Sequence, residues 1–314
     1  MLSKEKPVSI LSEKPYFELS IQVKNVEAHV LVNGIDVFSE VDGNFVSTEI
    51  PINHWLSPRD NDFRVMFRSL NEDGKYGDSA KVDVQLQVSN DGSGARYPIC
   101  NLIFNAQILQ PGFELDTIMP AVSLVSSSAF KPGGGGDVII DEAVLEQEED
   151  FSEFSSIGRK VKMQINIPEW EFFNSDTVPD VNELSDADYE KYRNELLKEY
   201  LKIQNAIATK NIASIVNMFD ERNKELDAAF FYKPGTMKKK IFEALTDAAN
   251  DADAELLELL PEYVGFYSYM TPKLIKLIRE DGGAAIAQNF KKAMGSQSFD
   301  LIFRYKNGKW ILTR

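Results

Sequence analysis

The spacing of apolar residues changes once along this chain of 314 residues, and that change limits the fold more than any motif does. In the first hundred residues apolar and polar side chains alternate, which is typical of strands with one buried face. After Ser185 the apolar residues recur three and four positions apart, which is typical of helices. We therefore expect an all-β part followed by a part that begins with helices.

The amino-terminal alternating runs are short and separated by turn sequences. Asn-Gly or Asp-Gly pairs stand at residues 33–34, 42–43, 73–74 and 91–92, and such pairs favour tight turns. The runs are Phe17–Val23, Val26–Val32, Phe45–Ile50, Phe63–Phe67, Val82–Val88 and Tyr97–Phe104. A later run, Val161–Ile167, is expected to return to the same sheets. The pattern predicts an antiparallel β-sandwich.

The stretch Ile52–Phe63 (INHWLSPRDNDF) resembles a corner of immunoglobulin-like modules. There an aromatic–aliphatic pair ends one strand, and a Pro/Asn turn begins the next. The resemblance implies an immunoglobulin-like sandwich for the amino-terminal domain, which we expect to span residues 1–173. Within it, residues 107–160 form an irregular acidic insertion in our interpretation, because the alternation is lost and four glycines stand at 133–136.

The carboxy-terminal part is predicted to be an α+β domain of residues 185–314, joined by a linker at 174–184. Ser185 followed by two aspartates is a favourable helix start. Helices are predicted from there, over Ile212–Tyr232 and over Met237–Leu260, where Pro261 ends the third. The predicted strands are Tyr263–Met270, Leu274–Arg279, Ala284–Phe290, Phe299–Tyr305 and Trp310–Thr313.

This order of elements, with the phrase AIATKNIASIVNMFDERNKEL and the final Asn-Gly hairpin, resembles the nuclear-transport-factor-2-like α+β cone. The resemblance implies helices followed by an antiparallel meander. The long third helix departs from that family's pattern, so the topology stays open.

The net charge limits the classes of partner. With 49 acidic and 34 basic residues the formal charge is −15, which argues against nucleic acid and against an anionic membrane surface, since both need a basic face. No apolar run has the length of a signal peptide core or a membrane span, so we expect a cytoplasmic protein. The single cysteine, Cys100, excludes an intramolecular disulfide.

We find no residue pattern that predicts catalysis, a metal site or a cofactor. His29 and His54 lack a second ligand at metal-binding spacing, and we expect structural roles for both. Cys100 stands in an apolar run and is expected to be buried. The glycines at 133–136 lack the lysine of a phosphate loop. The predicted cone contains no histidine, which argues against an acid–base enzyme there.

Negative charge is concentrated in one segment of the sequence. Between Asp141 and Glu190 there are 15 acidic and 3 basic residues, which gives −12 of the total −15. Large apolar residues alternate with these acids, as is typical of a surface that docks onto a basic protein. A solvated spacer is the alternative. The candidate partner-binding residues are Glu146, Glu148, Glu149, Asp150, Phe151, Phe154, Glu169, Trp170, Glu171, Phe172 and Phe173.

The sequence favours a non-catalytic inhibitor that binds a basic protein. In its acidic character it resembles, by kind and without a motif, bacterial immunity proteins that cap a toxic effector. Two alternatives stay open. One is a ligand-binding, glycan-binding or scaffold protein with Trp55 and Trp170 as contacts, and the other is an enzyme that uses a pocket in the carboxy-terminal domain.

Overall fold

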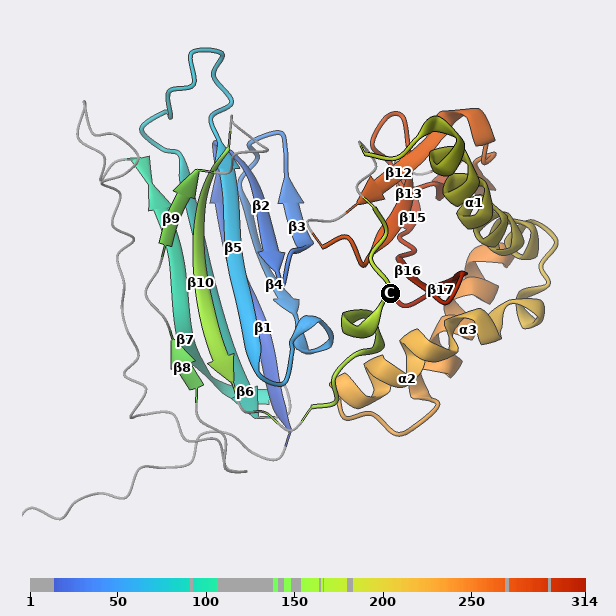
Figure 1. The fold of residues 1–314 in the computed structure, drawn as a ribbon, viewed down its shortest axis with the longest axis horizontal. Helices are drawn as coiled ribbons and strands as arrows, with labels where there is room; N and C mark the ends of the chain where they lie inside the picture. Colours follow the sequence, from blue (N-terminus) through green and yellow to red (C-terminus); the bar gives the residue numbers. More distant parts are fainter. Residues whose placement is uncertain are drawn as a thin grey trace, which may run out of the picture. The chain divides into compact units, whose positions relative to one another are not determined.

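The computed structural model describes most of the chain, which separates into two compact units (Figure 1). Unit 1 comprises Met1–Glu169 and unit 2 comprises Trp170–Arg314. The described residues are 14–90, 93–106, 138–140, 144–147, 154–163, 165, 167–179, 183–268, 271–292 and 295–314. Each unit is described below by itself.

Unit 1 consists of two antiparallel sheets that form two layers (Figure 1). The first has the strand order β4-β1-β6-β7, and the second β3-β2-β5-β10-β8, with β9 also paired to β10. The strands of the first are β1 Pro15–Lys24, β4 Val46–Pro51, β6 Lys81–Asn90 and β7 Ser93–Asn105. Those of the second are β2 Glu27–Val32, β3 Ile35–Glu40, β5 Asp60–Arg68, β8 Val138–Ile140, β9 Val144–Gln147 and β10 Ser155–Met163.

The alternating pattern explains why these segments form strands. In β1 the side chains of Phe17, Leu19, Ile21 and Val23 are all buried, so one face of the strand supplies the core. The predicted antiparallel β architecture is therefore confirmed. The late returning strand is also present as β10, which pairs with β5 but begins at Ser155, six residues before the predicted start.

Unit 2 contains three α-helices and two antiparallel sheets among its described residues. The helices are α1 Asp186–Ala208, α2 Asp220–Ala229 and α3 Thr236–Asn250. One sheet has the order β11-β14-β15, with β11 Ala254–Leu256, β14 Ile286–Phe290 and β15 Ser296–Phe299. The other has the order β12-β13-β16-β17, with β12 Val264–Ser268, β13 Ile275–Arg279, β16 Phe303–Lys306 and β17 Lys309–Leu312.

Tyr200 joins α1 to the four-stranded sheet at the centre of this unit. Its ring is buried, its hydroxyl donates to the Leu301 carbonyl (2.5 Å), and the same oxygen accepts from the Leu277 amide (3.0 Å). Burial raises the pKa of this phenol. A buried hydroxyl with both a donor and an acceptor partner has no uncompensated desolvation cost, so α1 is fixed in register with the sheet.

Three predicted elements of unit 2 differ from the structure. The helix expected over Ile212–Tyr232 is broken into two 3-10 turns and the ten-residue α2. The third helix ends at Asn250 rather than Leu260, because the Asp251 carboxylate accepts from the Asp253 amide (2.8 Å) and closes a turn before β11. The strand expected over Phe299–Tyr305 is two strands in different sheets.

Candidate functional site

The predicted aromatic anchors at the start of unit 2 are buried rather than exposed. The side chains of Trp170 and Phe172 are only 1% and 2% exposed, and Phe173 is half-buried with its ring 4.2 Å from that of Phe172. Glu169 and Glu171 are exposed. Trp170 and Phe172 therefore cannot offer their rings to a partner in this conformation, and their predicted role as docking anchors is corrected to one in packing.

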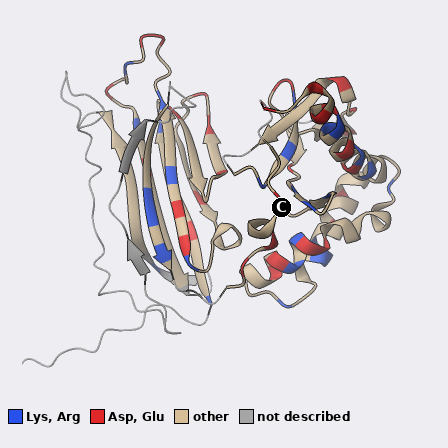
Figure 2. Ribbon diagram, in the orientation of Figure 1, with Lys and Arg blue, Asp and Glu red and all other residues tan. Residues whose placement is uncertain are grey.

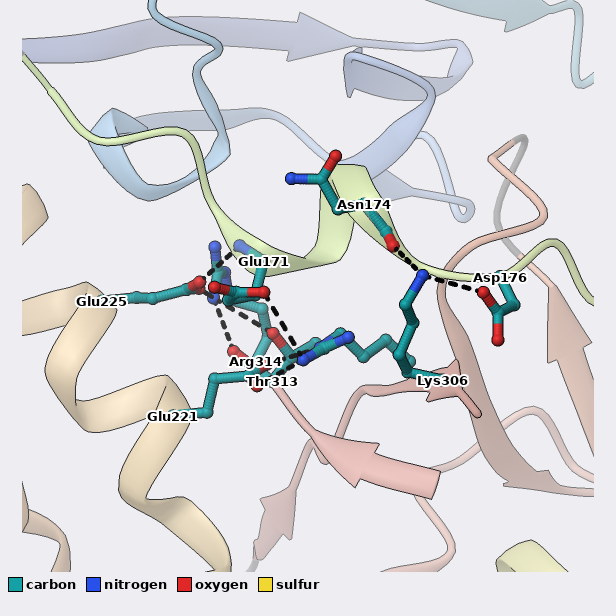
Figure 3. Close-up of polar contacts among 9 residues, drawn as sticks. Glu171, Asn174, Asp176, Glu221, Glu225, Lys306, Thr313 and Arg314 are labelled. Carbon is teal, nitrogen blue, oxygen red and sulfur yellow. Dashed lines mark hydrogen bonds and ion pairs between the residues drawn. The ribbon is translucent and has the colours of Figure 1, made fainter. Parts of the chain in front are cut away.

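A network of hydrogen bonds and ion pairs around two buried arginines holds this segment on unit 2 (Figure 3). Arg304 of β16 donates two hydrogen bonds to Glu221 of α2, at 2.7 and 2.6 Å. Arg314 donates to Glu225, whose other oxygen accepts from the Glu171 backbone amide (2.6 Å). We call these five residues the arginine–glutamate clamp. It ties the 3-10 turn that begins at Glu171, helix α2, strand β16 and the last residue of the sequence to one another.

The electrostatics of the clamp follow from burial and pairing. The hydrogen bonds to Glu221 raise the pKa of Arg304, whereas burial lowers that of Arg314 although Glu225 opposes it. Burial and the nearby charge of Arg314 lower the pKa of Arg222 to about 10.

The region expected to be a linker is also anchored to unit 2. The Lys306 ammonium donates to the Asn174 carbonyl (2.8 Å) and pairs with Asp176 (2.9 Å), as Figure 3 shows. Asp176 also accepts from the Asn307 amide (2.8 Å). The Asp176 carboxylate therefore binds the predicted Asn-Gly hairpin turn. Both turn residues, Asn307 and Gly308, have positive φ.

The acidic insertion is represented only in part. Glu148, Glu149, Asp150 and Phe151 lie outside the described residues, and for Glu146 the structure gives the strand β9 but not the side chain. Phe154 is described. Its ring lies under the Arg68 guanidinium, with 4.8 Å between the Cζ atom and the centroid, and 5.6 Å from the His29 ring.

His29 belongs to a polar cluster on the second sheet of unit 1. Its Nδ1 atom lies 2.9 Å from Asp36 and 3.0 Å from Ser39, and its Nε2 atom lies 3.4 Å from Glu27. Glu27 in turn accepts from Arg68 (2.6 Å). The cluster joins β2, β3 and β5 at the end of the sheet, and within the described residues no group of His, Cys, Asp and Glu side chains has a metal-binding arrangement.

A surface that the sequence did not reveal lies at the same end of unit 1. Val41, Phe45 and Leu70 have exposed fractions of 53%, 67% and 46%, in the loop between β3 and β4 and the loop between β5 and β6. Leu70 contacts Gly43, whose carbonyl accepts from the Asn25 amide (3.0 Å). The two loops and the β1–β2 turn therefore lie together, and we call residues 40–46 and 69–79 the loop-end surface.

The loop-end surface combines these apolar side chains with negative charge. It contains five acidic residues and one lysine, which gives −4, and Figure 2 shows acidic residues at the tip of the β5–β6 loop. Asp73 pairs with Lys75 (3.2 Å). Asp42, Glu72 and Asp78 are exposed and have no basic partner in the part of the chain that the structure describes. Exposed apolar residues ringed by unpaired charge are typical of protein-binding sites.

The Asp-Gly pairs at 42–43 and 73–74 were the only sequence signal for this surface. They predict turns, but the alternating run Phe45–Ile50 places Phe45 at the start of a strand, whereas β4 begins one residue later, at Val46. Which loops meet at one end of a sandwich depends on strand order, which alternation does not give.

Comparison with known proteins does not assign the chain to a family. No protein-family model matches it, and a search of curated proteins returns no relative. Among the described residues, none of the helices has both the length and the apolar character needed to span a bilayer. Trp55 and Trp170, the contacts considered for a ligand-binding role, are both buried.

Proposed function

We propose that this chain is a non-catalytic binding protein that docks onto a basic protein through the loop-end surface of unit 1. The observation that carries the proposal is the gathering of Val41, Phe45 and Leu70 beside unpaired carboxylates on adjoining loops. Apolar side chains at the centre of an interface supply most of its affinity, and surrounding charge speeds and orients the encounter.

The distribution of charge over the two units supports the same kind of partner. Unit 1 has 26 acidic and 14 basic residues, a net charge of −12, and unit 2 has 23 and 20, a net charge of −3. A field of one sign on unit 1 raises the association rate of a basic protein. Phe154, one of the predicted anchors, lies near this surface. Its ring contacts Arg68 at the end of β5, two residues before Leu70.

We infer that the biological role is inhibition, as in an immunity protein that neutralises a toxic effector. Effectors that act on nucleic acid present a basic active surface, and an acidic cap covers such a surface sterically without any chemistry of its own. This role requires no cofactor and no catalytic residue in the chain.

Capture from a lysate of the source organism tests the proposal. The wild-type chain, a Val41→Ser/Phe45→Ser variant and a Tyr263→Ser control are immobilised in parallel. The control removes a ring that is exposed to 51% on unit 2. We expect one basic protein to be retained stoichiometrically by the wild type and the control, and to be lost from the double variant.

The inhibitory role needs a second readout on the captured protein. Its gene, expressed alone, should arrest growth, and co-expression of the wild-type chain but not of the double variant should restore growth. Equal retention by all three chains would place the binding site elsewhere. If the three chains retain the protein as expected but its expression does not arrest growth, the chain binds a basic protein without being an inhibitor of a toxic effector.

A further inference from the structure

Unit 2 carries one exposed basic surface beside exposed aromatic rings. Lys233, Lys239 and Lys240 are exposed, and Tyr232 and Phe242 have exposed fractions of 41% and 39%. The Lys240 ammonium lies 4.7 Å from the centroid of the Tyr232 ring. We call residues 232–242 the lysine surface. It contains four lysines and no acidic residue, in a unit whose net charge is −3.

The position of these lysines is electrostatically unfavourable for the helix that carries them. Lys238, Lys239 and Lys240 stand within the first five residues of α3, near the positive end of the helix dipole, where acidic residues are normally preferred. Lys238 is compensated by Asp220 (2.9 Å), and Lys239 is 3.7 Å from Glu243. A local arrangement that disfavours its own helix is expected at functional sites.

The start of α3 is instead capped from the neighbouring helix. Asp227 of α2 is buried, and its two carboxylate oxygens accept from the amides of Gly235 (2.6 Å) and Met237 (2.8 Å). This buried carboxylate fixes the direction of the first turn, so the lysines are held on a rigid element. Lys233 and Lys240 form no ion pair within the described residues, and their charge is available to a ligand.

We propose that the lysine surface of one molecule binds the loop-end surface of a second copy. The two surfaces are complementary: four lysines beside Tyr232 and Phe242 face a net charge of −4 beside Val41, Phe45 and Leu70. The five apolar residues of the two surfaces, together with Tyr263, are the large apolar side chains found exposed in the described part of the chain. The inference does not depend on the existence of a foreign partner.

The resulting contact is head-to-tail and weak. Each molecule offers two different surfaces, so both an open chain and a closed ring satisfy the pairing. Two copies of charge −15 repel each other, but that repulsion is screened over about 8 Å at physiological salt, whereas charges in direct contact are screened much less. Self-association and docking of a basic protein use the same loop-end surface, so the two compete.

Charge reversal on each surface tests the pairing by sedimentation velocity. The wild type, whose monomer mass is 35.4 kDa, should show a weight-average mass that rises with concentration. Two variants, Lys239→Glu/Lys240→Glu and Glu72→Lys/Asp78→Lys, should each remain monomeric. Lys198→Glu/Lys210→Glu makes the same change in net charge as Lys239→Glu/Lys240→Glu, at exposed sites outside the lysine surface, and should associate like the wild type.

An equimolar mixture of the two variants gives the sharpest outcome. Each variant retains one intact surface, so the mixture should form complexes of at least twice the monomer mass. A wild type that stays monomeric at all concentrations, or a mixture that stays monomeric, would overturn the inference. So would a monomeric wild type that co-sediments with phosphatidylserine vesicles, since the lysine surface would then bind a membrane.

The same variants separate this inference from the proposed function. Lys239→Glu/Lys240→Glu keeps the loop-end surface, so it should still capture a basic partner from the lysate even where self-association is lost. Failure of the sedimentation test with intact capture would remove only the head-to-tail contact.

Discussion

Leu70 lies directly over Gly43, and its Cδ1 atom is 2.1 Å from the position that a Cβ atom on residue 43 would occupy. Gly43 has φ +73°, which disfavours any side chain there. A glycine in the β3–β4 loop therefore lets an apolar side chain of the β5–β6 loop lie against backbone. This contact assembles the loop-end surface from two loops that are 27 residues apart in the sequence.

Replacing Gly43 by alanine should destabilise unit 1 and displace Leu70. The left-handed backbone costs a side chain about 1–2 kcal/mol. The clash adds about 1 kcal/mol or less, because Leu70 is 46% exposed and its side chain can turn away. Gly74→Ala is the matched control, because Gly74 has φ +71° but open space around it. Urea unfolding should therefore show a larger loss for Gly43→Ala than for Gly74→Ala, and equal losses would mean that Leu70 moves freely.

Removing one ion of the arginine–glutamate clamp should destabilise unit 2 strongly. The side chains of Arg304 and Glu221 are 6% and 20% exposed, so Arg304→Met leaves a poorly solvated carboxylate, at a cost of about 3–5 kcal/mol. Lys276→Met breaks a more exposed pair with Asp300 and should cost below about 1 kcal/mol. Denaturant unfolding measures both, and similar losses would mean that the clamp is well hydrated.

The contribution of His29 to stability should fall as pH rises. Burial lowers the pKa of His29, but hydrogen bonds and charges from Asp36 and Glu27 outweigh it, so the pKa lies above the ordinary 6.5. A folded-state pKa above the unfolded one means that this stabilisation is complete below pH 6.5 and is lost as pH rises through the folded-state pKa. The difference in unfolding free energy between wild type and His29→Gln should shrink from pH 5.5 to pH 8.5; a constant difference would contradict it.

Cys100 should be inert while the protein is folded. The thiol is buried in β7, and burial raises its pKa to about 12, with Arg159 opposing. Because the thiolate is the reactive form, iodoacetamide at pH 8 should leave the native protein unmodified and alkylate it fully in concentrated urea. Mass spectrometry reports the result, and rapid alkylation of native protein would show that β7 opens.

The elements predicted correctly from the sequence are those defined by local signals: the alternation of side chains, the turn residues and the helix cap. Alternation located β1 and β6, and Asn33-Gly34 forms the expected turn, since both residues have positive φ. Ser185 caps α1 as expected, with its hydroxyl accepting from the Asp188 amide (3.2 Å).

The remaining features depend on tertiary partners that periodicity does not contain. Trp170 and Phe172 have the same sequence pattern as docking anchors. In the structure, however, Glu225 accepts from the adjoining Glu171 amide, and the Arg314 guanidinium lies over the Phe172 ring. In the same way, the apolar run Phe299–Tyr305 was predicted as one strand. Its first residue ends β15, which pairs with β14, and its last residues belong to β16, which pairs with β17 in the other sheet.

The dissociation constant of the captured basic protein tests the central claim most directly. Measured by calorimetry, Phe45→Ser should weaken binding about 30-fold, the loss of about 2 kcal/mol expected for an aromatic anchor at an interface. Tyr263→Ser should leave the constant unchanged. A Phe45→Ser variant that binds as tightly as the wild type would contradict the assignment of the loop-end surface as the docking site.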